Sequence, residues 1–224
     1  MHIIIVGSGK LATELLSSLK LGDNYQIASW ADRKNINATS IVVHAGSGRE
    51  LSSVIAYCRA TASSLIELAT GSGIESESHD FPVVLCPNTN VLMLKFMLML
   101  ETSSHLFRDY KVSLVESHQA SKTSVAGTAV TIAQSIGLTA TDIHSVRDPN
   151  VQRTELQIPD DQLARHAYHQ IRIEADGCKL QLESHVYNES PYADGVSRII
   201  EVVRNHKLDH RCYSVMEFLK NGWL

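Results

Sequence analysis

Short apolar runs alternate with longer stretches of helical spacing over the first ninety residues of this chain. The runs are rich in β-branched residues, a pattern typical of parallel strands covered on both faces. Leucines recur on one helical face from Leu11 to Leu19, and a second helix is expected from Arg49 to Thr61. The strands are expected at His2–Val6, Tyr25–Trp30, Ile41–His44, Ser64–Ala69 and Phe81–Leu85. This alternation predicts an α/β fold with a Rossmann-type doubly wound parallel sheet.

The pattern changes after a strongly apolar helix expected at about 91–103. Polar and apolar residues then alternate on both sides of Asp176 and Gly177, which is a good signal for a β-hairpin. The expected elements here are strands at Lys111–Glu116, Asp142–Arg147, His169–Ala175 and Lys179–Tyr187, a helix at Gly127–Ser135 and a helical C-terminus from Tyr192. The second half therefore predicts an α+β domain with a mixed, open-faced sheet.

Composition narrows the classes of protein that fit this pattern. The 224 residues are 44% hydrophobic and 20% charged, and the net charge of −4 gives no general attraction to nucleic acid or anionic membranes. Four cysteines lack Cys-x-x-Cys spacing, and the N-terminus does not resemble a signal peptide. The most apolar run, Val91–Leu100, contains Lys95 and is too short to span a bilayer. We expect a cytoplasmic protein with no metal site, no nucleic-acid partner and no membrane partner.

A dinucleotide fingerprint follows the first expected strand. Gly7 permits a tight turn, Gly9 lets the backbone approach a pyrophosphate, and Ala12 allows close contact between helix and strand. The alternative is a glycine turn without a ligand. The strand–turn–helix context favours nucleotide binding, and we assign Lys10 and Leu11 to the same site.

Two oppositely charged residues, Asp32 and Arg33, follow the second strand, twenty residues beyond the fingerprint. A carboxylate there is placed to accept hydrogen bonds from ribose hydroxyls, and a cation there is placed to pair with a 2′-phosphate. The alternative is a solvated charged turn. Having both residue types predicts use of NADH or NADPH.

The segment from Glu116 to Lys122 holds the residues best suited to proton transfer. A short apolar strand ends near His118, and Lys122 follows four positions later. Gly127 and Thr128 then open a helix whose N–H groups are suited to a carboxylate. The alternative is a surface histidine and a solvated lysine on a loop.

The sequence resembles the dihydrodipicolinate reductase (4-hydroxy-tetrahydrodipicolinate reductase) family. The family has a Glu-x-His-His-x-x-Lys segment followed by a Pro-Ser-Gly-Thr-Ala turn. Here these stand as Glu116-Ser117-His118-Gln119-Ala120-Ser121-Lys122 and Ala126-Gly127-Thr128-Ala129. Other family-like pieces, in order over nearly the whole chain, are Gly7-Ser8-Gly9, Asp32-Arg33, Ala69-Thr70-Gly71, Pro87-Asn88, Ser145-Val146-Arg147, His169-Gln170-Ile171 and Glu183-Ser184-His185.

The resemblance implies an NAD(P)H-dependent oxidoreductase of lysine and diaminopimelate biosynthesis. It would reduce 4-hydroxy-tetrahydrodipicolinate, a small dicarboxylate, to tetrahydrodipicolinate by hydride transfer. His118 and Lys122 would be catalytic, and Gln119, Gly127 and Thr128 would bind substrate. The implied nucleotide site adds four loop residues that follow strand ends: Ala45, Thr70, Gly71 and Asn88. The family is usually a homotetramer.

The change of pattern after about residue 90, together with the resemblance, gives the expected division of the chain. Residues 1–90 would bind the dinucleotide, completed by C-terminal helices in 192–224, and residues 91–191 would bind substrate and mediate oligomerisation.

The chain departs from the family at three points. Gln119 replaces a second histidine, the Pro-Ser before Gly-Thr is Val125-Ala126, and no arginine occurs from Val186 to Ser190. Gln119 still donates hydrogen bonds but does not titrate. Two alternatives therefore stay open: another NAD(P)-dependent reductase or dehydrogenase of a small carboxylated substrate, and a non-catalytic nucleotide-binding relative.

Overall fold

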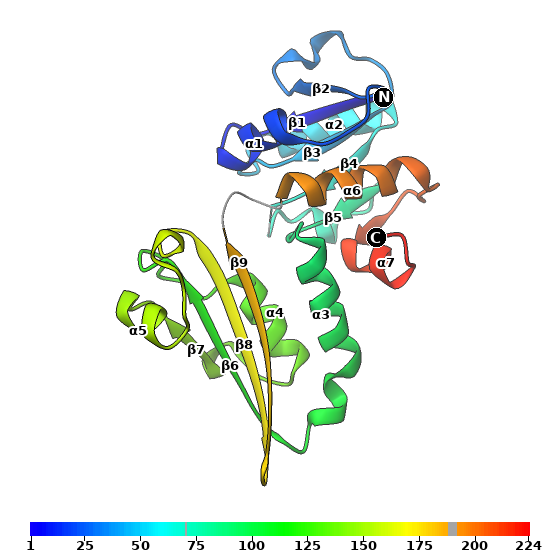
Figure 1. Ribbon diagram of the computed structural model, residues 1–224. Helices are drawn as coiled ribbons and strands as arrows, with labels where there is room; N and C mark the ends of the chain where they lie inside the picture. Colours follow the sequence, from blue (N-terminus) through cyan, green and yellow to red (C-terminus); the bar gives the residue numbers. More distant parts are fainter. Residues whose placement is uncertain (70, 188–191) are drawn as a thin grey trace. The chain divides into compact units, whose positions relative to one another are not determined.

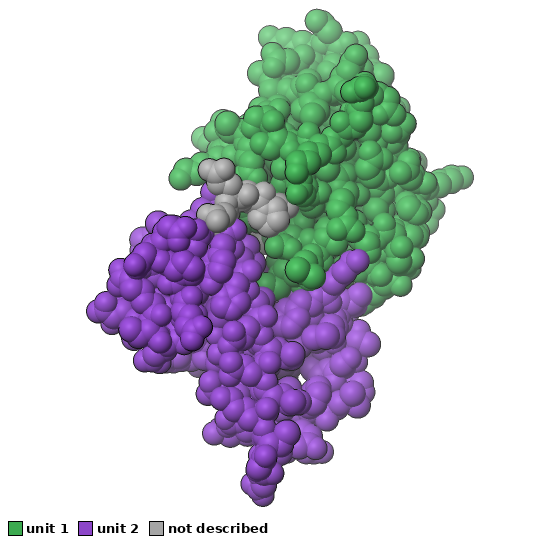
Figure 2. Space-filling view, viewed as in Figure 1, with its two compact units in different colours: residues 1–94, 191–224 green, residues 95–190 purple. Residues whose placement is uncertain are grey.

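The computed structural model describes residues 1–69, 71–187 and 192–224. The chain forms two compact units (Figure 2), one built from residues 1–94 and 191–224 and the other from residues 95–190. The first unit is discontinuous in sequence because the second is inserted into it. Helix α3 (Val91–Ser103) begins in the first unit and ends in the second.

The first unit is built on a six-stranded sheet in which every neighbouring pair is parallel (Figure 1). The strand order is β10-β5-β4-β3-β1-β2. The strands are β1 (His2–Val6), β2 (Gln26–Ser29), β3 (Ser40–His44), β4 (Ser64–Glu67), β5 (Val83–Leu85) and β10 (Cys212–Ser214). The chain moves outward from β1 in both directions, so the doubly wound parallel sheet predicted from the sequence is confirmed.

Helices cover this sheet on both faces. Helix α2 packs through Val54 and Cys58 on Ile4 and Val42, which are all fully buried. Helices α1 and α6 pack against each other, and the Lys20 N–H donates to Ser197 Oγ. The helical segments of this unit are α1 (Lys10–Ser18), α2 (Leu51–Thr61), α6 (Tyr192–Asn205), α7 (Val215–Lys220) and the short turns η1 (Asp32–Asn35) and η2 (Ile74–Ser76).

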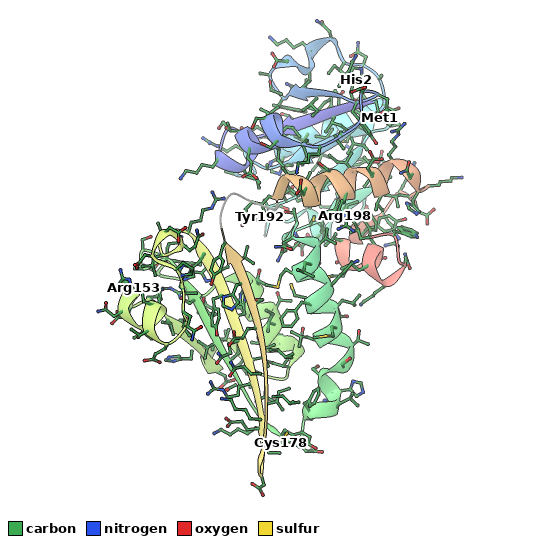
Figure 3. All side chains as sticks on the ribbon, in the orientation of Figure 1. Met1, His2, Arg153, Cys178, Tyr192 and Arg198 are labelled. Carbon is green, nitrogen blue, oxygen red and sulfur yellow. The ribbon has the colours of Figure 1, made fainter. Side chains whose placement is uncertain are left out.

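The second unit is built on a mixed four-stranded sheet in the order β7-β6-β8-β9. Strand β6 is parallel to β7 and antiparallel to β8, which forms a long hairpin with β9. Cys178 lies at the tip of this hairpin, and Arg153 lies on α5 (Figure 3). The elements are β6 (Lys111–His118), β7 (Ile143–Val146), β8 (His166–Ala175), β9 (Cys178–Tyr187), α4 (Gly127–Ser135), α5 (Pro149–Thr154), η3 (Ser104–Phe107), η4 (Ala140–Asp142) and η5 (Asp160–Gln162).

Helix α3 is the most apolar helix, and its predicted bounds are those observed. It buries Met93, Leu94, Met97 and Leu100, while Leu92 is 79% exposed. Among the described helices, none combines the length and apolar character that a bilayer crossing requires.

Apart from shifts of one or two residues at element ends, four differences from the sequence predictions stand out. Strand β6 continues through His118, β8 begins at His166 rather than at residue 169, and two short elements, α5 and β10, were not predicted. Three-residue and six-residue elements are too short to show a period. The polar start of β8 is stabilised by pairing across the hairpin, which sequence alone does not display.

Candidate active site

A row of polar side chains crosses one face of the second sheet. In the strand register Glu116 of β6 pairs with Ser145 of β7 and with His169 of β8, and His169 pairs with Ser184 of β9. Residues in register across a sheet share a face, and so do residues two apart on one strand. His118 therefore lies on the same face as Glu116, and the strand geometry gathers these groups.

Glu116 is the centre of this row. Its fully buried carboxylate accepts from His118 Nδ1 at 2.6 Å, Arg147 Nη2 at 2.5 Å and Ser145 Oγ at 2.5 Å. Burial by itself raises the pKa of Glu116, but the hydrogen bonds from His118, Arg147 and Ser145 outweigh it and hold the pKa at about 2. Glu116 is therefore a buried anion with three cationic or polar partners fixed against it.

His118 is oriented by this anion. Its Nδ1–H donates to Glu116, which leaves Nε2 for a ligand, and 14% of the side chain is exposed. The His169 ring packs edge-on against it, with ring centroids 6.0 Å apart. Burial, and then the neighbouring His118, lower the pKa of His169 to about 4. His169 is therefore uncharged near neutral pH, and its ring lies against the ring of His118.

Arg147 ties the loop after β6 to Glu116. The guanidinium that contacts Glu116 also donates through Nε to the Lys122 carbonyl at 2.8 Å and through Nη2 to the Ser124 carbonyl at 3.3 Å. The Lys122 N–H donates to the Gln119 carbonyl, which closes a turn. Lys122 is half-buried, and its ammonium group has no carboxylate partner among the described residues. The predicted His118 and Lys122 are thus linked through Glu116 and Arg147.

The same loop leads into α4. Ala126 is the N-cap and makes no side-chain capping bond, and the first turn contains no acidic residue. A Cβ added to Gly127 would meet nothing within 4 Å, so the space beside the helix N-terminus is open. N–H groups at such an end favour an anion. Gly127 and Thr128 therefore stand where a carboxylate could bind.

Glu116, Ser145, Arg147 and His169 were not identified as site residues from the sequence. A signal was present for Glu116, because a residue two positions before His118 on one strand shares its face. The roles of Arg147 and Ser145 depend on which strand lies beside β6, and the apolar pattern does not specify this.

In the first unit, the predicted fingerprint forms the turn between β1 and α1. Gly7 has a φ of +125°, and a Cβ there would lie 2.7 Å from the Ala45 carbonyl oxygen. Glycine is therefore required where the loops after β1 and β3 meet, at the point where strand order reverses and such sheets bind ligands. Gly9 caps α1 without a side-chain bond and has open space beside it. The first-turn N–H groups, with Lys10 and Leu11, fit a dinucleotide pyrophosphate.

Asp32 and Arg33 begin η1 directly after β2. Ser29 Oγ donates to the exposed Asp32 carboxylate at 2.5 Å. The Arg33 guanidinium lies 3.5 Å from the centroid of the Trp30 ring and donates to the Trp30 carbonyl. This stacking holds a flat cation on the residue that follows Asp32, and the two residue types fit the ribose and phosphate end of a dinucleotide.

The remaining predicted nucleotide residues lie in loops after β3, β4 and β5. Ala45 is half-buried against Gly7, and Gly71 has a φ of +68°. The Asn88 side-chain oxygen accepts from the Asn90 N–H at 2.9 Å. Thr70 lies outside the described residues. Because all the strands are parallel, these loops follow one edge of the sheet.

Comparison with known proteins assigns the second half of the chain. Residues 91–219 match the family model described as dihydrodipicolinate reductase, C-terminus. A probable 4-hydroxy-tetrahydrodipicolinate reductase 1, chloroplastic, of Oryza sativa subsp. japonica is 27% identical over 157 residues, which cover 62% of this chain and 45% of that protein. The Arabidopsis thaliana reductase 1 is 26% identical over 153 residues, covering 62% and 44%. The matched region thus spans under half the length of these relatives.

Solved structures share the fold over nearly the whole chain. Dipicolinate-bound dihydrodipicolinate reductase from Paenisporosarcina sp. TG-14 has a TM-score of 0.65 and 16% identity, covering 96% of this chain and 97% of that one. The C. glutamicum DAP dehydrogenase in complex with DAP has a TM-score of 0.55 and 8% identity, covering 97% and 93%. At these identities the likeness concerns the fold alone. The family model covers more than half of the sequence, and on that ground the chain belongs to the dihydrodipicolinate reductase family.

Proposed function

We propose that this protein reduces 4-hydroxy-tetrahydrodipicolinate to tetrahydrodipicolinate with NADH or NADPH, in lysine and diaminopimelate biosynthesis. The observation that carries the proposal is the Glu116-centred cluster. It orients His118 and ties down the loop of Lys122 within the segment that resembles the family's catalytic one. When bound, the nicotinamide nucleotide would supply the hydride.

The second unit would bind and polarise the substrate. One substrate carboxylate would accept hydrogen bonds from the N–H groups of Gly127 and Thr128, assisted by the Gln119 amide. The Lys122 ammonium would stabilise the negative charge that develops on the ring during reduction. His118 would deliver a proton from Nε2, while Glu116 keeps the ring oriented through its Nδ1–H, and the 4-hydroxyl group of the substrate would leave as water.

The first unit would hold the nucleotide. The α1 N-terminus would bind the pyrophosphate, Asp32 would accept from the adenosine ribose, and Arg33 would pair with a 2′-phosphate. With both groups present, the protein would accept either nucleotide. We also propose a homotetrameric assembly, as the family resemblance implies. The four free cysteines among the described residues support a reducing compartment such as the cytoplasm.

The departures from the family define the second candidate function. Gln119 cannot titrate where the family has histidine, and the segment 186–190 contains no arginine. A protein with weakened carboxylate binding would be a reductase of another small carboxylated substrate, or a nucleotide-binding relative without the reaction.

The test measures NAD(P)H oxidation at 340 nm with the cyclic precursor generated in situ by a coupled synthase. We expect oxidation that requires the precursor and falls at least about a hundredfold in Lys122→Ala, with nucleotide affinity unchanged. Lys179→Ala, an exposed lysine on β9, is the matched control and should oxidise normally. Nucleotide binding without precursor-dependent oxidation in the unmodified protein would reject the proposal and favour the second candidate.

A further inference from the structure

A second histidine–glutamate pair lies in the first unit, outside the groups assigned above. His44 ends β3 and Glu67 ends β4, and the two residues are in register. His44 Nδ1 lies 2.8 Å from both carboxylate oxygens, and both side chains are fully buried. A buried carboxylate needs hydrogen-bond donors. His44 Nδ1 is therefore the protonated ring nitrogen, and its N–H donates a hydrogen bond to the Glu67 carboxylate.

The pair is hydrogen-bonded to the loop after β4 and lies against the loop after β3. Glu67 Oε1 also accepts from the Ala69 N–H at 2.8 Å, and the His44 carbonyl accepts from the Leu68 N–H at 3.0 Å. On the other side, His44 Nε2 faces Gly46, where an added Cβ would lie 2.9 Å from that nitrogen and 3.3 Å from Glu50 Oε2. The histidine ring therefore lies against the loop after β3 and is joined through Glu67 to the loop after β4.

The loop after β3 lies at the reversal of strand order, and the loop after β4 follows the neighbouring strand. Ala45, next to His44, donates to the Val6 carbonyl and meets Gly7 of the fingerprint turn. Ala69 precedes Thr70 and Gly71, which the family resemblance assigns to the nucleotide site. A shift of the histidine ring would therefore move backbone on both sides of the expected nucleotide site, although neither side chain is exposed to a ligand.

We propose that His44 and Glu67 form a positioning pair that fixes the loops after β3 and β4 for binding of a nicotinamide dinucleotide. This inference rests on the proposed nucleotide site. The pair acts through the backbone at Ala45 and Ala69. Its loss lowers nucleotide affinity, and the chemical step at saturating nucleotide is spared.

Two variants remove the pairing, and one retains it. His44→Leu fills similar space without a donor, and Glu67→Gln removes the charge while keeping the shape. His44→Asn places an amide N–H near the position of Nδ1–H. We expect His44→Leu and Glu67→Gln to raise the Kd for NADH and NADPH about tenfold, and His44→Asn to stay within about threefold of the unmodified protein. The change in NADH or NADPH fluorescence on binding measures these Kd values.

The control acts on the opposite end of the same strands. Ser63 Oγ accepts from the Ser40 N–H at 2.8 Å within the buried amino end of the β3–β4 pair. Ser63→Ala should lower the free energy of unfolding and leave both nucleotide affinities unchanged. An equal loss of affinity in Ser63→Ala would overturn the proposal, because it would show a general effect of stability.

Amide hydrogen exchange tests the positioning pair independently of the proposed function, because it is measured on the protein without nucleotide. Faster exchange of the Ala45 and Ala69 N–H groups in His44→Leu and Glu67→Gln, with protection retained in His44→Asn, supports the positioning role. Unchanged exchange and unchanged Kd in both disrupting variants overturn it. An unmodified protein that binds neither nucleotide would reject the proposed function, and the exchange rates would still decide whether the pair fixes the loops.

Discussion

The first unit pairs His44 with Glu67, and the second pairs His118 with Glu116. In both pairs Nδ1 faces the carboxylate, at 2.8 Å in the first and 2.6 Å in the second. The first pair joins two neighbouring strands and is fully buried, whereas the second lies on one strand with 14% of the histidine exposed. The same two residue types are therefore set in different surroundings.

The difference lies in what each carboxylate holds besides its histidine. Glu67 accepts from a backbone N–H of the adjoining loop, so its pair fixes backbone. Glu116 accepts from Arg147 and Ser145, so its anion is stabilised strongly enough to orient an accessible imidazole. The other partners of the carboxylate and the exposure of the histidine, rather than the pair itself, therefore distinguish a group suited to chemistry from one suited to positioning.

The largest expected effect is on kcat, and it comes from replacing the glutamate of each pair by glutamine. Glu116→Gln removes the anion that fixes the His118 tautomer and the loop of Lys122, so we expect kcat to fall about a hundredfold with unchanged nucleotide affinity. Glu67→Gln should leave kcat at saturating nucleotide near normal. Steady-state kinetics of both variants measures this. Equal losses of kcat would break the comparison.

We expect low pH to destabilise the protein by protonating Glu116 of the second pair. Its pKa is lowered from 4.5 to about 2 in the folded protein, so its stabilising contribution is complete above about pH 4.5 and is lost as the pH falls toward 2. We expect about 2 kcal/mol of stability to be lost between pH 6 and pH 3 through this group. Urea unfolding followed by circular dichroism, compared with Glu116→Gln, isolates the contribution. A variant with the same acid sensitivity would contradict it.

The smallest expected effect is on the preference between NADH and NADPH, which depends on residues of the first unit. Asp32→Ala should weaken NADH binding more than NADPH binding, and Arg33→Ala should do the reverse, each by about fivefold. Titrations of the two nucleotides against both variants measure the shifts, and turnover at saturating nucleotide should not change. Equal effects of Asp32→Ala on both nucleotides would mean that Asp32 does not touch the ribose.

The fold was largely predictable because β-branched runs and glycine turns are local signals. The parallel sheet, the hairpin around Gly177 and helix α3 follow from such patterns. The roles assigned to His118 and Lys122 stay predictions, although the structure links the two through Arg147. The support by Arg147 and Ser145 was not predictable, since it depends on β7 lying beside β6.

The C-terminal strand has a consequence for how the protein is made. Strand β10, formed by residues 212–214, pairs with β5 at the edge of a sheet whose other strands all precede residue 86. During synthesis from the N-terminus, the ribosome completes residues 95–190 before it supplies α6 and β10. The inserted unit can therefore finish folding while the sheet of the first unit still has a bare edge at β5, open to mispairing until β10 has been synthesised.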